Sequence, residues 1–139
     1  MPRLFLILHR IVGGRLPAHA TGIGKALLAF SPDGTRLPHK LDGMLPARTT
    51  ATMTRPAALR QCLREVRANG VATDRGEAAS GLACVAAPII VNSRPVAAIS
   101  LAFPTTAGSG QQFVNPLREA AAAIARAVVT SAKVPLAAT

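Results

Sequence analysis

The chain has 139 residues, and 50% of them are hydrophobic, which is enough for one domain with a buried core and argues against intrinsic disorder. Its formal net charge is +10, but the basic residues are scattered, and Trp and Tyr, on which single-strand nucleic-acid binders stack bases, do not occur. We therefore expect at most weak, sequence-independent nucleic-acid contact from the chain itself.

The N-terminal part of the chain predicts a strand, a helix and a loop. Residues 5–12 form a strand-like apolar segment, whose apolar core is too short for a membrane span and short for a signal sequence. Residues 21–30 predict a helix that ends at Ser31 and Pro32. Residues 31–53 are interrupted by prolines and predict a loop with a short helix. The apolar face of the predicted helix consists of Ile23, Ala26, Leu27 and Phe30.

The clearest helical signal lies in residues 54–70. Thr54 is expected to cap this helix, Pro56 stands in the first turn where no backbone N–H is needed, and Gly70 ends it. A short strand at residues 71–74 follows. The buried stripe of the helix is expected to consist of Leu59, Cys62, Leu63 and Val66.

Two apolar runs, residues 82–91 and 95–103, predict a β-hairpin with Asn92 at its turn. Both runs are apolar on both faces, so we expect helices to cover the sheet on both sides. The last helix is expected to begin at Asn115, with an apolar face made of Leu117, Ala121, Ile124 and Val128.

This order of elements predicts an α+β domain with a mostly antiparallel sheet and helices on both faces. We expect a single domain over residues 1–133 and a flexible tail over residues 134–139.

The stretch HATGIGKALLAF, residues 19–30, is the first candidate site. It matches neither the P-loop nor the dinucleotide-binding pattern. The glycines at the predicted helix start leave the N–H groups of Gly22 and Ile23 free to bind a small anion such as a carboxylate. The alternative is a glycine turn that lets the helix pack closely on the sheet, and the residues alone favour this alternative.

Polar residues in and beside the strands form a second set of candidates. Asp74 could accept hydrogen bonds from a ligand hydroxyl or from nearby backbone N–H groups, or pair with Arg75. Ser100 is expected to be buried and to need a partner, either a ligand or the backbone. His19 and Cys84 could act as base and nucleophile, but a structural role for His19 is favoured. We expect no metal site and no cofactor.

Three stretches together resemble a known family: RLPAHATGIGKALLAF, PAALRQCLREVRANGVATDRGEAASGLACVAAPI and PVAAISLAFP. They are similar, in order and spacing, to the C-terminal effector-binding domain of the IclR family of bacterial transcriptional regulators. The resemblance implies a GAF-like, profilin-like fold that binds a small carboxylate effector, either a keto acid or an aromatic acid. The effector-binding residues that it implies are Leu16, Gly22, Ile23, Asp74, Leu82, Cys84, Ser100 and Ala102.

The same resemblance implies a cytoplasmic, non-enzymatic homodimer or homotetramer with no membrane contact. It reaches operator DNA only through a winged helix-turn-helix, which is expected to be absent from this chain, and the early strands of the sheet are expected to be partly missing. Ala102 stands where the family often has a hydroxyl. The alternatives are a degenerate oligomerisation module that binds no ligand, or a small cytosolic enzyme that uses Cys84 with His19.

Overall fold

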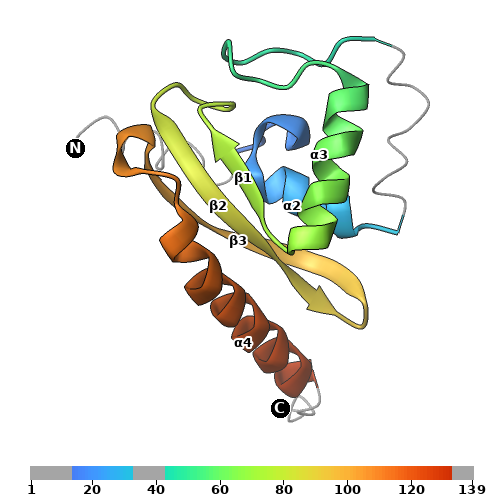
Figure 1. The fold of residues 1–139 in the computed structure, drawn as a ribbon. Coiled ribbons are helices and arrows are strands. Elements are labelled where there is room, and N and C mark those ends of the chain that lie inside the picture. The colour runs from blue at the N-terminus through green and yellow to red at the C-terminus, as the bar shows by residue number, and fades with distance from the viewer. Residues whose placement is uncertain (1–13, 33–42, 133–139) are drawn as a thin grey trace.

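The computed structural model describes residues 14–32 and 43–132. These residues form an antiparallel three-stranded sheet with helices on both faces (Figure 1). The predicted strand at residues 5–12 lies outside the described residues, and so does most of the loop in which a short helix was expected. Residues 43–55, the described remainder of that loop and the start of the next segment, contain turns but no helix.

The sheet has the order β1-β2-β3, with strands Ala72–Arg75, Leu82–Val91 and Arg94–Pro104. The hairpin between β2 and β3 is confirmed. Its two-residue turn consists of Asn92 and Ser93, whose φ angles of 51° and 63° are those of a type I′ turn. Strand β1 begins one residue later than predicted and pairs only with the first half of β2.

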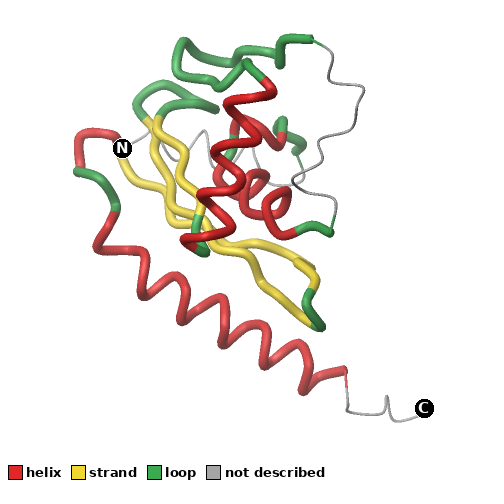
Figure 2. Tube along the Cα trace, turned by 45° about the vertical axis from the view of Figure 1, so that its right-hand side comes forward, coloured by secondary structure: helices red, strands yellow, loops and turns green. Residues whose placement is uncertain are grey.

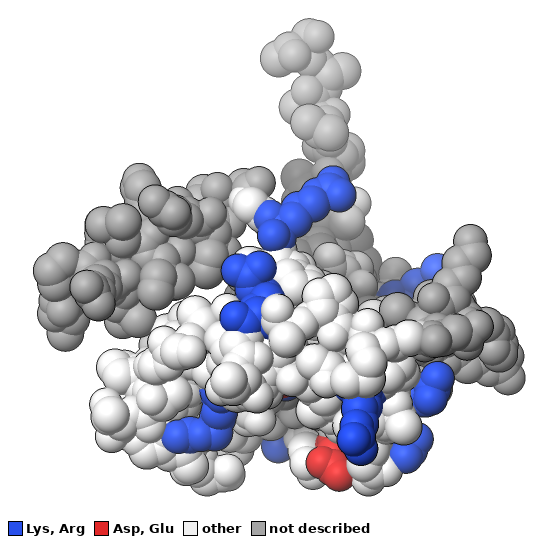
Figure 3. Space-filling model, turned by 90° about the horizontal axis from the view of Figure 1, so that it is seen from above, with Lys and Arg blue, Asp and Glu red and all other residues white. Residues whose placement is uncertain are grey.

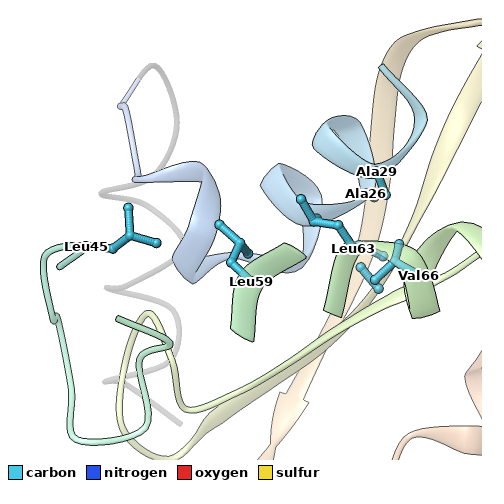
Figure 4. Packing of buried hydrophobic residues seen from close by; sticks show 8 residues of the cluster. Ala26, Ala29, Leu45, Leu59, Leu63 and Val66 are labelled. Atoms are coloured by element: carbon cyan, nitrogen blue, oxygen red, sulfur yellow. The ribbon is translucent and has the colours of Figure 1, made fainter. Parts of the chain in front are cut away.

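Helices α2, Gly22–Phe30, and α3, Pro56–Asn69, cover one face of the sheet. Short 3-10 turns connect these elements. The turn before α2 is η1, Ala18–Ala20, the turn after β3 is η2, Thr105–Ala107, and the turn that leads into α4 is η3, Gln111–Phe113. The cap predicted for α3 was wrong by one residue, because Arg55 and not Thr54 occupies the N-cap position. The core on this face combines small residues of α2 with larger ones of α3 and with Leu45 of the segment before α3. The labelled residues in Figure 4 are Ala26, Ala29, Leu45, Leu59, Leu63 and Val66.

The apolar face predicted for α2 was partly wrong. Ile23 is 39% exposed, whereas Lys25 is only 1% exposed. The helix turns its smallest residues toward the sheet, so it approaches closely and leaves the larger Leu27 and Phe30 half-buried. The residues of α2 that are buried are Gly22, Gly24, Lys25, Ala26 and Ala29.

Helix α4, Val114–Ala132, packs on the opposite face and starts one residue before the prediction. Only the first half of its predicted apolar face is buried: Leu117 and Ala121 belong to the second core, while Ile124 and Val128 are 38% and 42% exposed. Figures 1 and 2 show α4 running along the sheet toward the β2–β3 hairpin. Its sheet-facing stripe continues through Ala125, which packs on the second core, and Val129 lines a hollow with residues of β2, so Ile124 and Val128 lie beside this stripe.

The expectation that the sheet is covered on both faces holds for β2 but not for all of β3. In β3, Val96 and Leu101 are 55% and 37% exposed. Strand β3 is an outer strand among the described residues. Because it has a neighbouring strand on one side only, some of its apolar side chains remain uncovered.

Candidate functional site

The N-terminus of α2 lies directly over strand β2. Thr21 caps the helix, its side-chain oxygen accepting a hydrogen bond of 3.0 Å from the Gly24 N–H. The Gly22 N–H is directed at the Cys84 thiol. Among the described residues the Ile23 N–H has no hydrogen-bond partner. One of the two amides predicted to bind an anion is therefore free of backbone partners, and the other faces a sulfur atom.

The two glycines of this helix end are required by close packing. A Cβ atom on Gly22 would lie 2.7 Å from the Cys84 Sγ and 3.1 Å from the Ala86 Cβ. A Cβ atom on Gly24 would overlap the backbone of Ala18. The packing role that the sequence favoured is thus present, and it coexists with the free amide of Ile23.

A row of candidate residues crosses the sheet beneath this helix end. In the strand register, Asp74 lies opposite Cys84, and Cys84 lies opposite Ala102. Residues two apart on a strand share a face, so Leu82 and Ser100 lie on this face as well. Leu82 is half-buried, and so is Leu16 in the segment that precedes η1.

Ser100 corrects one prediction. Its side chain was expected to be buried, but the residue is exposed on the outer strand β3, opposite Ala86. The reason is that β3 has no strand on its outer side among the described residues. The hydroxyl therefore needs no protein partner and is open to solvent or to a ligand.

Asp74 is only 4% exposed, and its Oδ1 accepts a hydrogen bond of 2.7 Å from the Glu77 N–H. Burial raises the pKa of its carboxyl, and the Glu77 carboxylate raises it further, whereas the backbone N–H groups of Glu77 and Ala78 oppose the shift. Asp74 thus tightens its own loop. The alternative pairing with Arg75 is wrong, because that guanidinium donates to the carbonyls of Thr105 and Gly108.

A buried ion pair adjoins Asp74, and the sequence analysis missed it. Lys25 Nζ donates to Glu77 Oε2 at 2.7 Å, and the two residues are 1% and 9% exposed. The Glu77 carbonyl also accepts a hydrogen bond of 2.6 Å from the Thr52 hydroxyl. The available signal was the position of Lys25 on the stripe of small residues, between Gly22 and Ala29, that faces the sheet.

Glu77 also holds an unsatisfied atom. Its Oε1 is buried and has no hydrogen-bond partner among the described residues. Glu77 therefore contacts α2 through its carboxylate Oε2, the loop around Thr52 through its backbone carbonyl and the end of β1 through its backbone N–H, whereas Oε1 has no partner among the described residues.

The pairing of Cys84 with His19 is not formed. Burial raises the pKa of the Cys84 thiol to about 11, with a further contribution from the Asp74 carboxylate. His19 is buried, and its Nε2 lies 2.8 Å from the carbonyl oxygen of Pro46. A nucleophilic cysteine needs a lowered pKa, so this environment opposes such a role, and His19 fixes the turn before α2.

The described surface adds three observations. Figure 3 shows the Lys and Arg side chains of one face lying apart from each other and not gathered in a patch. No helix of the described segments is both long and apolar enough to span a bilayer. Within residues 14–32 and 43–132, no three His, Cys, Asp or Glu side chains are grouped so that they could hold a metal ion.

Comparison with known proteins identifies the family. Residues 3–128 match the family model described as "Bacterial transcriptional regulator IclR C-terminal". The chain is 43% identical over 96 residues to the transcriptional repressor IclR of Escherichia coli, covering 67% of this chain and 34% of the repressor. It is 35% identical to the regulator XynR of the same organism, covering 91% of this chain and 52% of XynR.

Solved structures agree with this assignment. The C-terminal domain of E. coli KdgR is 32% identical with a TM-score of 0.73, covering 81% of this chain and 71% of that domain. An IclR homolog from Microbacterium hydrocarbonoxydans, complexed with 4-hydroxybenzoate, is 33% identical with a TM-score of 0.72, covering 82% of this chain and 48% of that one. The chain spans between about a third and a half of the length of the two curated relatives. This chain belongs to the family of IclR-type C-terminal domains of bacterial transcriptional regulators.

Proposed function

We propose that the chain is the effector-sensing part of a transcriptional regulator and binds a small carboxylate at the N-terminus of α2. The observation that carries this proposal is the Ile23 N–H, which has no hydrogen-bond partner within the described segments and lies at the positive end of a helix above the polar row of Asp74 and Cys84. A helix dipole contributes about 0.3–1 kcal/mol to anion binding at an exposed site. Further contacts must therefore supply most of the affinity.

The polarity of the site favours a ligand with two different ends. The carboxylate lies at the Ile23 and Gly22 amides, while Asp74 repels it and instead accepts a hydrogen bond from a distant hydroxyl of the ligand. Leu16 and Leu82 supply apolar contacts, and Cys84 and Ser100 supply polar ones, whereas Ala102 supplies no hydroxyl. A hydroxylated aromatic acid has this chemistry, and a relative is complexed with 4-hydroxybenzoate.

Regulation then follows from a shift in population. A ligand that binds one arrangement of a homodimer or homotetramer more tightly than another favours that arrangement. In the full regulator, a winged helix-turn-helix would convert this change into altered operator binding. The sensing domain is proposed to extend over residues 1–133, with residues 134–139 as a tail.

Calorimetry with three related probes tests the site. We expect 4-hydroxybenzoate to bind more tightly than benzoate, which lacks the hydroxyl, and than 4-hydroxybenzamide, which lacks the charge. Asp74→Ala, which removes the acceptor, should abolish the preference for 4-hydroxybenzoate over benzoate, while Glu119→Gln on the exposed surface of α4 should leave it unchanged. Absence of heat with every probe, together with a stable oligomer, would instead favour the oligomerisation module.

A further inference from the structure

A hollow lies at the edge of β1 that has no neighbouring strand among the described residues. It has a volume of about 450 Å³ and is lined by residues of α3, of β1 and its approach, and of η3 and α4. Because α3 and α4 cover opposite faces of the sheet, the hollow wraps around the edge of the strand (Figure 1). Its polar lining residues are Cys62, Glu65, Asn69, Thr73, Gln111 and Arg118.

The main chain of Thr73 faces this hollow. In an antiparallel pair, alternate residues bond to the neighbouring strand and the residues between them point away from it. The Gly76 N–H donates to the Leu82 carbonyl at 2.7 Å, which places Asp74 and Ala72 among the residues bonded to β2. Thr73 therefore directs its N–H and C=O outward, so the hollow offers one peptide donor and one peptide acceptor.

Charges of opposite sign lie on the two sides of this peptide edge. Glu65 comes from α3, and its Oε1 accepts a hydrogen bond of 3.0 Å from the Gln61 amide, whereas Oε2 has no partner in the part of the chain that the structure describes. Arg118 comes from α4 and makes no side-chain hydrogen bond within the described residues. Its guanidinium occupies the space left by the missing side chain of Gly70, where a Cβ would lie 3.4 Å from Nη2.

We propose that this hollow binds a small zwitterion with a peptide-like backbone, namely a dipeptide. The ligand carboxylate accepts hydrogen bonds from Arg118, its ammonium group donates to Glu65, and its amide group pairs with the Thr73 main chain. Charge-assisted hydrogen bonds are the stronger class of hydrogen bond. The volume lies within the range of small-molecule sites, and the site is separate from the one at the N-terminus of α2.

Titration of the ¹⁵N-labelled chain with L-alanyl-L-alanine tests this proposal. We expect amide shifts at Thr73, Asn69 and Gln111, with a dissociation constant on the order of 1 mM. N-acetylation or C-terminal amidation of the dipeptide should each weaken binding about tenfold, because each removes one charge-assisted contact.

Variants of the protein separate recognition from nonspecific contact. Arg118→Gln and Glu65→Gln should each weaken binding of the uncapped dipeptide about tenfold. Arg94→Gln, which removes an exposed arginine at the distant hairpin, should not change it. Equal binding of capped and uncapped dipeptides, wild-type binding by Arg118→Gln, or no shifts at the β1 edge would each overturn the proposal.

Discussion

At the residue scale, the ion pair between Lys25 and Glu77 is the most consequential contact of the described fold. Both side chains are buried. We expect Lys25→Met to destabilise the domain by about 3–5 kcal/mol, because it leaves a carboxylate buried without its partner. Urea denaturation measures this change. The double variant Lys25→Met/Glu77→Gln should recover most of the loss, and a single variant as stable as the double one would contradict the prediction.

The raised pKa of the Cys84 thiol predicts that the domain loses stability at alkaline pH. Burial raises its pKa from 9.0 to about 11 in the folded state. Between these two values the folded protein binds more protons than the unfolded one, so the stability falls as the pH rises from about 9 to 11. Denaturation curves at several pH values should show this fall in the wild type and a smaller one in Cys84→Ala.

The thiol of Cys84 should also react slowly. A disulfide reagent such as Ellman's reagent attacks the thiolate, whose population at pH 8 is small when the pKa is raised to about 11. We expect Cys84 to react at least about tenfold more slowly than a free thiol of ordinary pKa. Fast reaction in Cys62→Ser, which retains only Cys84, would restore the enzyme hypothesis that the comparisons disfavour.

The burial of charged residues was the feature least predictable from the sequence. Lysine is almost never fully buried unless it is paired, so its residue type argued against burial of Lys25 although its place on the stripe of small residues in α2 favoured it. Its partner lies 52 positions away in a loop. By contrast, the structural role of His19 followed from its place before a glycine-containing helix start.

At the element scale, the hairpin turn can be improved. Asn92 and Ser93 both have positive φ angles, which favour Asn at the first position and Gly at the second. We expect Ser93→Gly to stabilise the domain by about 0.5–1 kcal/mol, and thermal unfolding would measure it. Asn92→Ala, which removes a residue suited to this conformation, should act in the opposite direction, and a loss of stability in Ser93→Gly would contradict this account.

The helices and the hairpin were predictable because their signals are local. Pro56 and Gly70 lie at the two ends of α3, and Asn92 lies in the turn. The sequence did not correctly predict which residues of the α4 face are buried. The periodicity of α4 predicts the approximate direction of its apolar face, but not which of two neighbouring residues lies at the centre of that face. The half-buried residue is Ala125, and Ile124 and Val128 are therefore exposed.

At the scale of the whole molecule, exposed apolar residues on two elements favour self-association. Val96 and Leu101 on β3, and Ile124 and Val128 on α4, are each more than one third exposed. We expect sedimentation velocity to show larger species as the protein concentration rises. Val96→Lys or Ile124→Lys should weaken this association about tenfold.

A matched exposed position provides the control. Ala123→Lys introduces the same charge on an exposed part of α4 that belongs to neither apolar core. It should leave the association unchanged. If all three lysine variants behave alike, net charge and not apolar contact controls the association.

Strand β1 places consecutive residues in two different environments. Asp74 is oriented toward the end of α2, while Thr73 lies at the open side of the sheet. Because one short segment of backbone carries both, any displacement of the strand that a molecule bound at Thr73 causes is imposed on the Asp74 carboxylate as well. If such a displacement changes the affinity for the ligand proposed at α2, thermodynamic reciprocity requires that each occupant alter the affinity of the other by the same factor.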